Sequence, residues 1–250
     1  MNILTQLGSE WSLALLINAS LISIAQFFLP LLTPLGWINS GILGVILWGC
    51  LGWRGWIGVV IYFTLGSLVT RIGYKRKKSK GLEESRLRGG RRGPENVWGS
   101  AATGAAIAIL VKLGIASQAI LLLCFSASFT TKLADTFGSE IGQCYGKKSF
   151  LITSLRSVAP GTDGAISLEG TFASLFGAIL MSISFFFIGF IPEANLIVLI
   201  SIVAFLSTII ESYIGATVQK KLSWLSNELV NFFQTTIAAL FTYILSINFI

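Results

Sequence analysis

Long apolar runs, separated by breaks that contain glycine, proline or polar residues, constrain this sequence more than any other feature. Each run is close to the roughly 20 residues that a helix needs to cross the hydrocarbon core of a bilayer. Backbone polar groups inside a bilayer must be satisfied within the segment, which favours helices. The sequence therefore predicts an all-α, polytopic integral membrane bundle of about eight transmembrane helices, within a range of about six to nine. The eight runs are 11–29, 35–53, 56–72, 97–113, 115–134, 172–191, 196–213 and 229–249.

The composition supports the same class. Hydrophobic residues make up 54% of the 250 residues and charged residues only 12%, whereas a soluble domain usually carries about 25% charged residues. Because so few charges cannot cover a surface in water, we expect a single membrane domain over residues 1–250. Histidine is absent from the sequence, which excludes Ser-His-Asp triads and histidine metal sites.

Basic residues predict the orientation of the chain. The region 71–92 carries ten Lys and Arg residues, and such loops stay on the cytoplasmic side of a membrane. With three spans before this basic cytoplasmic loop, which we place at 74–93, the N-terminus lies outside. The same threading puts 16 of the 18 basic residues inside and leaves only Arg54 and Lys112 outside. We expect the active face to be cytoplasmic, or stromal if the membrane is organellar.

Acidic residues concentrate on that same face. Charged side chains in or beside membrane spans are costly and usually functional. Polar residues at helical spacing accompany them, as in Asn96, Ser100 and Thr103, or Asn227, Asn231 and Thr235, which predicts a polar chamber rather than a lipid-facing surface. The threading gathers seven of the eleven acids there: Glu95, Asp135, Glu140, Asp163, Glu169, Glu211 and Glu228.

These residue types suit a phosphorylated, magnesium-bound ligand. Carboxylates with amide oxygens favour Mg²⁺, and nearby Lys and Arg can hold phosphates. The sequence contains neither a GxxxxGK[ST] P-loop nor a GxGxxG motif, but we interpret 135–170 as a cytoplasmic or re-entrant motif segment. Within it, Gly161-Thr-Asp-Gly164 can present backbone N–H groups to phosphates. The predicted reaction is phosphoryl or nucleotidyl transfer to a substrate whose other end lies in lipid.

Five blocks of the sequence lie at 91–100, 134–142, 161–171, 211–217 and 227–231. Together they resemble a known family, the phytyl-phosphate kinase family of polytopic membrane proteins. One difference is Glu211, where we would expect Asp in many relatives. The resemblance implies a kinase of the tocopherol and phylloquinone pathways, which converts phytyl phosphate to phytyl diphosphate with CTP or another nucleoside triphosphate as donor.

The resemblance and the residue chemistry lead to the same site hypothesis. We expect the catalytic residues to be Asp135, Asp163 and Glu211. The predicted Mg²⁺ ligands are Asp135, Glu140, Asp163 and Glu169. The predicted nucleotide- and phosphate-binding residues are Arg91, Arg92, Asn96, Lys132, Arg156, Gly161, Thr162, Gly164, Asn227 and Asn231.

The same residues are also compatible with other functions. A CTP-dependent lipid nucleotidyltransferase or a kinase for a free prenyl alcohol would use similar residues. A transporter with a polar central cavity is a further alternative, although the outer ends of the spans carry almost no polar residues. The expected partners are an isoprenoid phosphate, a nucleoside triphosphate and membrane lipids, with no nucleic acid and no predicted oligomeric state.

Overall fold

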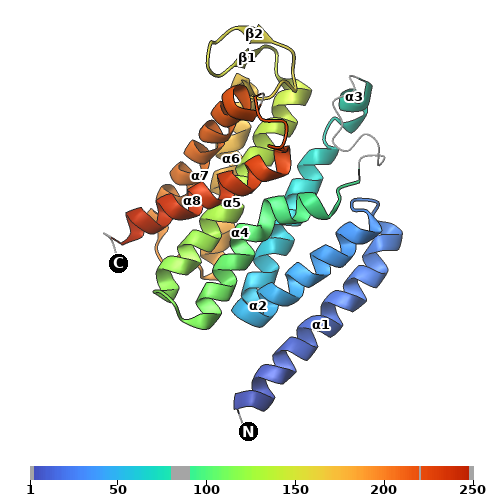
Figure 1. Ribbon diagram of the computed structural model, residues 1–250, viewed down its shortest axis with the longest axis vertical. Helices are drawn as coiled ribbons and strands as arrows, with labels where there is room; N and C mark the ends of the chain where they lie inside the picture. The colour runs from blue at the N-terminus through green and yellow to red at the C-terminus, as the bar shows by residue number, and fades with distance from the viewer. Residues whose placement is uncertain (1–2, 80–90, 220, 248–250) are drawn as a thin grey trace.

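The computed structural model describes residues 3–79, 91–219 and 221–247 as a helical bundle (Figure 1). Within these residues, seven helices are long and apolar enough to cross a membrane. This confirms the predicted all-α membrane bundle, with a count inside the expected range. The helices are α1 (Ile3–Phe28), α2 (Pro34–Arg71), the short α3 (Tyr74–Ser79), α4 (Pro94–Leu113), α5 (Gln118–Tyr145), α6 (Leu168–Ile188), α7 (Ala194–Ile214) and α8 (Asn227–Ser246).

Helix α2 corresponds to two of the predicted spans. It contains 38 residues, but Gly52 has φ 68° and ψ −169°, which is not helical. Glycine reaches positive φ without the steric cost that a Cβ would bring. The helix therefore turns back at Gly52, and Figure 1 shows one arm leading down to the break and the other leading away from it. The two arms match the predicted runs 35–53 and 56–72.

Helix α5 lies at the centre of the bundle. Its 28 residues correspond to about 42 Å at 1.5 Å per residue, which exceeds the roughly 30 Å of a hydrocarbon core. Phe125 and Phe129 are fully buried, with ring centroids 5.0 Å apart. Phe125 also contacts Phe185 of α6 edge-on at 5.8 Å. The extra length carries the last turns of α5 beyond the apolar layer at one end.

Local signals at the helix ends explain why the chain reverses where it does. The hydroxyl groups of Thr33, Ser167 and Ser226 accept backbone N–H bonds and cap α2, α6 and α8, which satisfies donors that a helix start leaves unpaired. Helices α4 and α6 end at Gly114 and Gly189, both in the left-handed conformation, a common helix termination.

The connection between α5 and α6 forms a small antiparallel sheet. Its strands are β1 (Ser149–Leu151), β2 (Ser157–Val158) and β3 (Ala165–Ile166), in the order β2-β1-β3. Phe150 pairs with Ser157 on one side and with Ile166 on the other. The motif segment 135–170 thus comprises the end of α5, this sheet and the start of α6. Of the basic loop 74–93, residues 80–90 lie outside the described part of the chain.

Candidate active site

A polar cavity of about 480 Å³ lies at the end of the bundle that carries α3 and the strands. It is lined by the end of α2, α3, the start of α4, the last turns of α5, the loop before β3, the end of α7 and the start of α8. Segments far apart in sequence therefore meet at one place. The predicted site residues that line it are Arg92, Asn96, Lys132, Asp135, Glu140, Gly161, Thr162, Asp163, Gly164, Glu211, Asn227 and Asn231.

Lys132 is a buried cation on the wall of this cavity. Only 7% of the residue is exposed, and a buried charge requires partners. Its Nζ donates to Asp135 Oδ2 at 2.5 Å and to Asn231 Oδ1 at 2.9 Å. Lys132 and Asp135 are three residues apart on α5, so they share a helix face, whereas Asn231 comes from the first turns of α8. The pair thus ties α5 to α8 and holds one carboxylate in a defined position.

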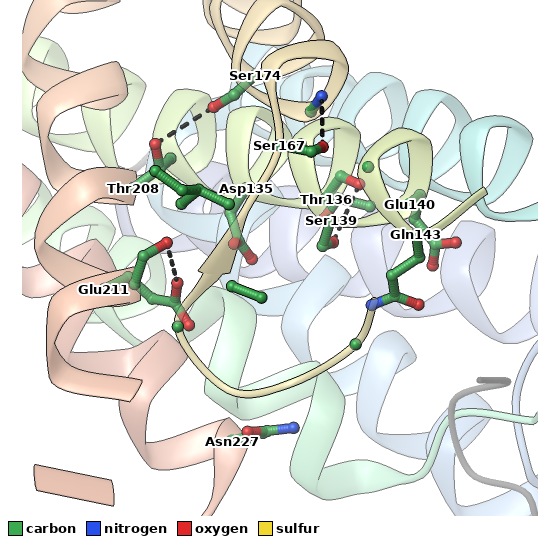
Figure 2. Close-up of a pocket in the computed structure, with 18 of the residues that line it drawn as sticks. Asp135, Thr136, Ser139, Glu140, Gln143, Ser167, Ser174, Thr208, Glu211 and Asn227 are labelled. Atoms are coloured by element: carbon green, nitrogen blue, oxygen red, sulfur yellow. Dashed lines mark hydrogen bonds between the residues drawn. The ribbon is translucent and has the colours of Figure 1, made fainter. Parts of the chain in front are cut away.

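Glu211 brings a second carboxylate to the cavity. Figure 2 shows Glu211 and Asp135 on the same side of the cavity, with Glu140 and Gln143 on the other side of the view. Directly after α7 the chain continues as a π-helix, η2 (Gly215–Gln219). Such wider turns occur often at functional sites, because they redirect side chains within an otherwise regular helix.

The loop that carries Asp163 packs closely against this π-helix. Gly164 has φ +73°, and a Cβ at this position would overlap the Ser212 carbonyl oxygen and approach Ala216 N to 2.5 Å. Only glycine combines this backbone conformation with such a close approach. Gly164 therefore allows Asp163, an exposed residue, to reach the cavity wall beside Glu211.

Asparagine side chains complete the wall. Asn96 accepts a bond from Gly93 N at 3.0 Å and donates to Glu228 Oε1 at 3.2 Å, so it joins the starts of α4 and α8. Asn227 accepts from Gln219 Nε2 at 2.5 Å, which links α8 to η2. These bonds fix the orientation of two amide groups at the cavity.

Comparison with known proteins identifies the family. The model of the family "Integral membrane protein DUF92" matches residues 17–239 of this chain. The chain belongs to this family. No solved structure matches it.

Three relatives of known sequence resemble the chain. It is 45% identical over 235 residues to "Uncharacterized membrane protein sll0875" of Synechocystis sp., which is 93% of this chain and 90% of that protein. It is 41% identical over 214 residues to "Protein VTE6, chloroplastic" of Arabidopsis thaliana, covering 81% of this chain and 62% of that protein. It is 31% identical over 207 residues to "Uncharacterized membrane protein MJ0933" of Methanocaldococcus jannaschii, covering 82% of each. These matches confirm the family resemblance that the motifs indicated.

Three predicted site residues do not line the cavity. Arg91 and Arg156 are exposed, and Glu169 in the first turn of α6 accepts a bond from Lys147 N at 3.3 Å. Among the described residues, no group of three or more Asp, Glu, Cys or His side chains is arranged to hold a metal ion. The structure therefore brings Asp135 and Asp163 to one cavity with Glu211, but it does not gather the four predicted metal ligands into one cluster.

Lys77 is a cavity residue that the sequence reasoning missed. It lies in α3, is 3% exposed, and forms an ion pair with Glu140 of α5. Its Nζ also donates to the Thr70 carbonyl oxygen at 2.8 Å. In sequence, Lys77 is one of several basic residues in a row. Its spacing from Thr70 is not a helical signal, because α2 ends at Arg71 and Gly73, with φ 65°, interrupts the helix before α3.

Proposed function

We propose that this protein is a membrane prenyl-phosphate kinase. It transfers the γ-phosphoryl group of CTP or another nucleoside triphosphate to phytyl phosphate, and the products are phytyl diphosphate and CDP or the corresponding diphosphate. The observation that carries the proposal is a polar cavity at one end of a membrane bundle, where the carboxylates of Asp135, Asp163 and Glu211 adjoin the cations Lys132 and Arg92. The 41% identity to VTE6 and the motif resemblance to phytyl-phosphate kinases support it.

The chemistry requires positioning more than proton transfer. An oxygen of the acceptor phosphate forms a bond to the γ-phosphorus, while the bond between that phosphorus and the β,γ-bridging oxygen breaks. The leaving nucleoside diphosphate keeps the bonding electrons. A phosphate monoester has its second pKa at about 6, so it is already mostly a dianion near neutral pH and needs no strong base. The absence of histidine from the sequence is compatible with this reaction.

The cavity residues supply the two kinds of contact that such a transfer needs. Lys132 and Arg92 bind phosphate oxygens, and Asn96, Asn227 and Asn231 donate hydrogen bonds to the nucleotide. The carboxylates of Asp135, Asp163 and Glu211 would hold and orient the nucleotide together with its metal ion. Preorganised charge in a site of restricted water access stabilises the transition state more than the same charge in water.

The residues also fit Mg²⁺ that arrives with the nucleotide. Mg²⁺ in phosphoryl-transfer sites is held by one or two carboxylates plus substrate phosphates rather than by a complete protein cage. The cavity presents carboxylates without a closed cluster of three, and Asp135 and Glu211 would hold the ion. When bound, Mg²⁺ supplies neutralisation of the charge on the transferred phosphoryl group. We further propose that this end of the bundle faces the cytoplasm or the stroma, because the described parts of the basic loop, α3 and residues 91–93, adjoin it.

A product assay tests the proposal. Protein purified in detergent is incubated with phytyl phosphate, Mg²⁺ and each nucleoside triphosphate in turn, and products are identified by mass. We expect phytyl diphosphate and a nucleoside diphosphate in equal amounts, with formation lost on addition of EDTA. The matched variants are Asp135→Asn in the cavity and Glu193→Gln at the exposed start of α7. D135N should lose about 100-fold or more in rate, and E193Q should keep the native rate.

Two results would contradict the kinase. Inorganic diphosphate together with a CDP-linked lipid would assign the site to nucleotidyl transfer. If D135N and the native protein have equal rates, and melting curves show that both are folded, the cavity takes no part in the reaction.

A further inference from the structure

A second cavity adjoins the polar one and has the opposite character. It has a volume of about 330 Å³ and lies between α1, both arms of α2 and the start of α4. Its walls are mostly aromatic and aliphatic, with Trp37 and Leu43 from the first arm of α2 and Val60 and Phe63 from the second. We call this space the apolar pocket. Each of these walls belongs to a helix long and apolar enough to span a membrane, so the pocket lies beside the bilayer interior.

The two cavities share part of their lining. Arg92, Asn96 and Ser100 line both the polar cavity and the apolar pocket. A ligand with a phosphate at Arg92 and Asn96 can therefore place an apolar chain in the pocket while its phosphate faces the carboxylates. This matches the shape and the polarity of an isoprenoid phosphate, which is anionic at one end and apolar along the rest.

The structure holds Arg92 firmly at this junction. Arg92 forms a parallel β-bridge with Leu32, in the turn between α1 and α2. Its backbone N donates to the Leu31 carbonyl oxygen and its carbonyl accepts from Thr33 N, both at 3.0 Å. Its guanidinium donates to Thr70 Oγ1 at 3.3 Å. The turn that closes the pocket is thus bonded directly to the residue that faces the phosphate.

At the end of the pocket away from Arg92, two polar side chains are hydrogen-bonded to each other. Trp56 Nε1 donates to Asn18 Oδ1 at 3.0 Å, and both residues line the pocket. From Trp56 to Phe63 on the second arm of α2, seven residues at 1.5 Å each span about 10 Å. The pocket therefore encloses the part of a chain nearest the phosphate, and a longer chain continues into the lipid.

We infer that the apolar pocket binds the first isoprene units of the acceptor and sets the enzyme's preference for an isoprenoid over a straight acyl chain. This inference rests on the proposed function, because it takes the polar cavity as the place of phosphoryl transfer. An acceptor dissolved in a bilayer gains little from apolar burial alone, since lipid is equally apolar. The pocket acts instead through shape, by presenting the acceptor phosphate in one orientation.

Labelling tests the location without requiring turnover. A phytyl phosphate analogue with a diazirine on the second isoprene unit is irradiated with the detergent-purified protein, and labelled peptides are identified by mass. We expect labels on pocket residues of α1 and α2 such as Ala25 and Val60, protected by excess phytyl phosphate. Phosphatidic acid, which offers a phosphate on straight acyl chains, should protect at least tenfold less well. Labels confined to other helices, or equal protection by phosphatidic acid, would overturn the inference.

A filling substitution tests whether the isoprene units beyond the first occupy the pocket. Ala25 lines the pocket from α1, whereas Ala19 is exposed on the same helix. Ala25→Trp should lower the ratio of kcat/KM for phytyl phosphate over dimethylallyl phosphate at least tenfold, and Ala19→Trp should leave that ratio unchanged. Val60→Phe, from the opposite wall, should act in the same direction and serves where A25W does not fold. An unchanged ratio in both folded pocket variants would overturn the inference.

The two proposals fail separately. If the native protein shows no turnover of any prenyl phosphate but labelling is confined to the pocket and protected by phytyl phosphate, the kinase proposal fails and the binding site stands. If turnover is present and labels lie outside the pocket, the kinase stands and the binding site fails.

Discussion

The two ends of the bundle are connected in different ways. At the end away from the cavity, the chain reverses at the Gly52 break, between α4 and α5 after Gly114, and between α6 and α7 after Gly189, with φ values of 68°, 65° and 85°. At the cavity end, the turn between α1 and α2 is short, but the other connections are longer and occupy 72–93, 146–167 and 215–226. Short loops need only a residue that allows the reversal, while longer ones can present side chains to a ligand.

Glycines at the two ends of the bundle have different structural roles. The glycines at the far end allow the backbone to reverse with a positive φ. Gly164 at the cavity end also allows a close contact, because it packs against other backbone. The same residue type therefore has two roles. Substitutions matched between the two ends should separate effects on activity from effects on stability.

The largest difference is expected between two lysines. Lys132→Met removes the cation that bonds Asp135 and Asn231 and leaves a half-buried carboxylate without its ion pair, at a cost of at most about 3–5 kcal/mol. We expect a lower Tm and a loss of kinase rate of about 100-fold or more. Lys112→Met, exposed in the last turn of α4 at the far end, should cost about 0.3 kcal/mol and keep the rate. Comparable losses in the two variants would contradict the distinction between the ends.

Two glycines with the same backbone conformation give the next comparison. Gly164 and Gly114 have φ +73° and +65°, but a Cβ would overlap Ser212 at the first and meet nothing within 4 Å at the second. Alanine in the left-handed conformation costs about 1–2 kcal/mol at either position. Only Gly164→Ala should also displace the Asp163 loop and lower kcat, by about tenfold or more. Tm and initial rates in the same detergent measure both effects, and a full native rate in folded G164A would refute the role given to this contact.

Substitutions of two adjacent arginines should differ by a smaller amount, and the difference should appear in KM. Arg92 lines both cavities, while Arg91 is exposed and lines neither. Arg92→Gln removes a charge-assisted bond to phosphate, worth about 1.5–3 kcal/mol, so KM for the phosphorylated acceptor should rise about 10- to 100-fold. Arg91→Gln should change KM less than about twofold, as expected of an exposed charge. Steady-state kinetics with varied acceptor decide the matter, and equal KM values for the two variants would place the acceptor phosphate elsewhere.

The positions of the polar helix ends could be predicted from the sequence for a physical reason. A membrane span restricts charged residues to its ends or to a protected interior, and the basic loop orders those ends in space. Asp135, Glu211 and Asn231 could therefore be assigned to one face from their positions alone. Their spacing along each helix further indicated which side faces the interior.

Other parts of the site depend on contacts that local sequence does not encode. Whether Arg91 or Arg92 faces the cavity is decided by the β-bridge to Leu32, about sixty residues earlier in the chain. Lys77 is buried because Glu140, 63 residues later, pairs with it. The strands of the α5–α6 connection have only two or three residues each, too few for an alternating pattern to be recognised.

The smallest predicted effect defines how far the site extends into the bundle. Below the cavity, Thr103 of α4 bonds Thr235 and Thr236 of α8 at 2.8 and 2.9 Å. Hydrogen bonds between membrane helices contribute about 0.6 kcal/mol on average, so Thr103→Val should lower Tm slightly and leave kcat and KM unchanged. A double-mutant cycle of T103V and T235V should give a coupling of about that size. A rate loss in T103V like that of the Lys132 variant would mean that the polar contacts between α4 and α8 belong to the reaction, and that the division between a reactive end and a structural interior lies deeper than this threonine.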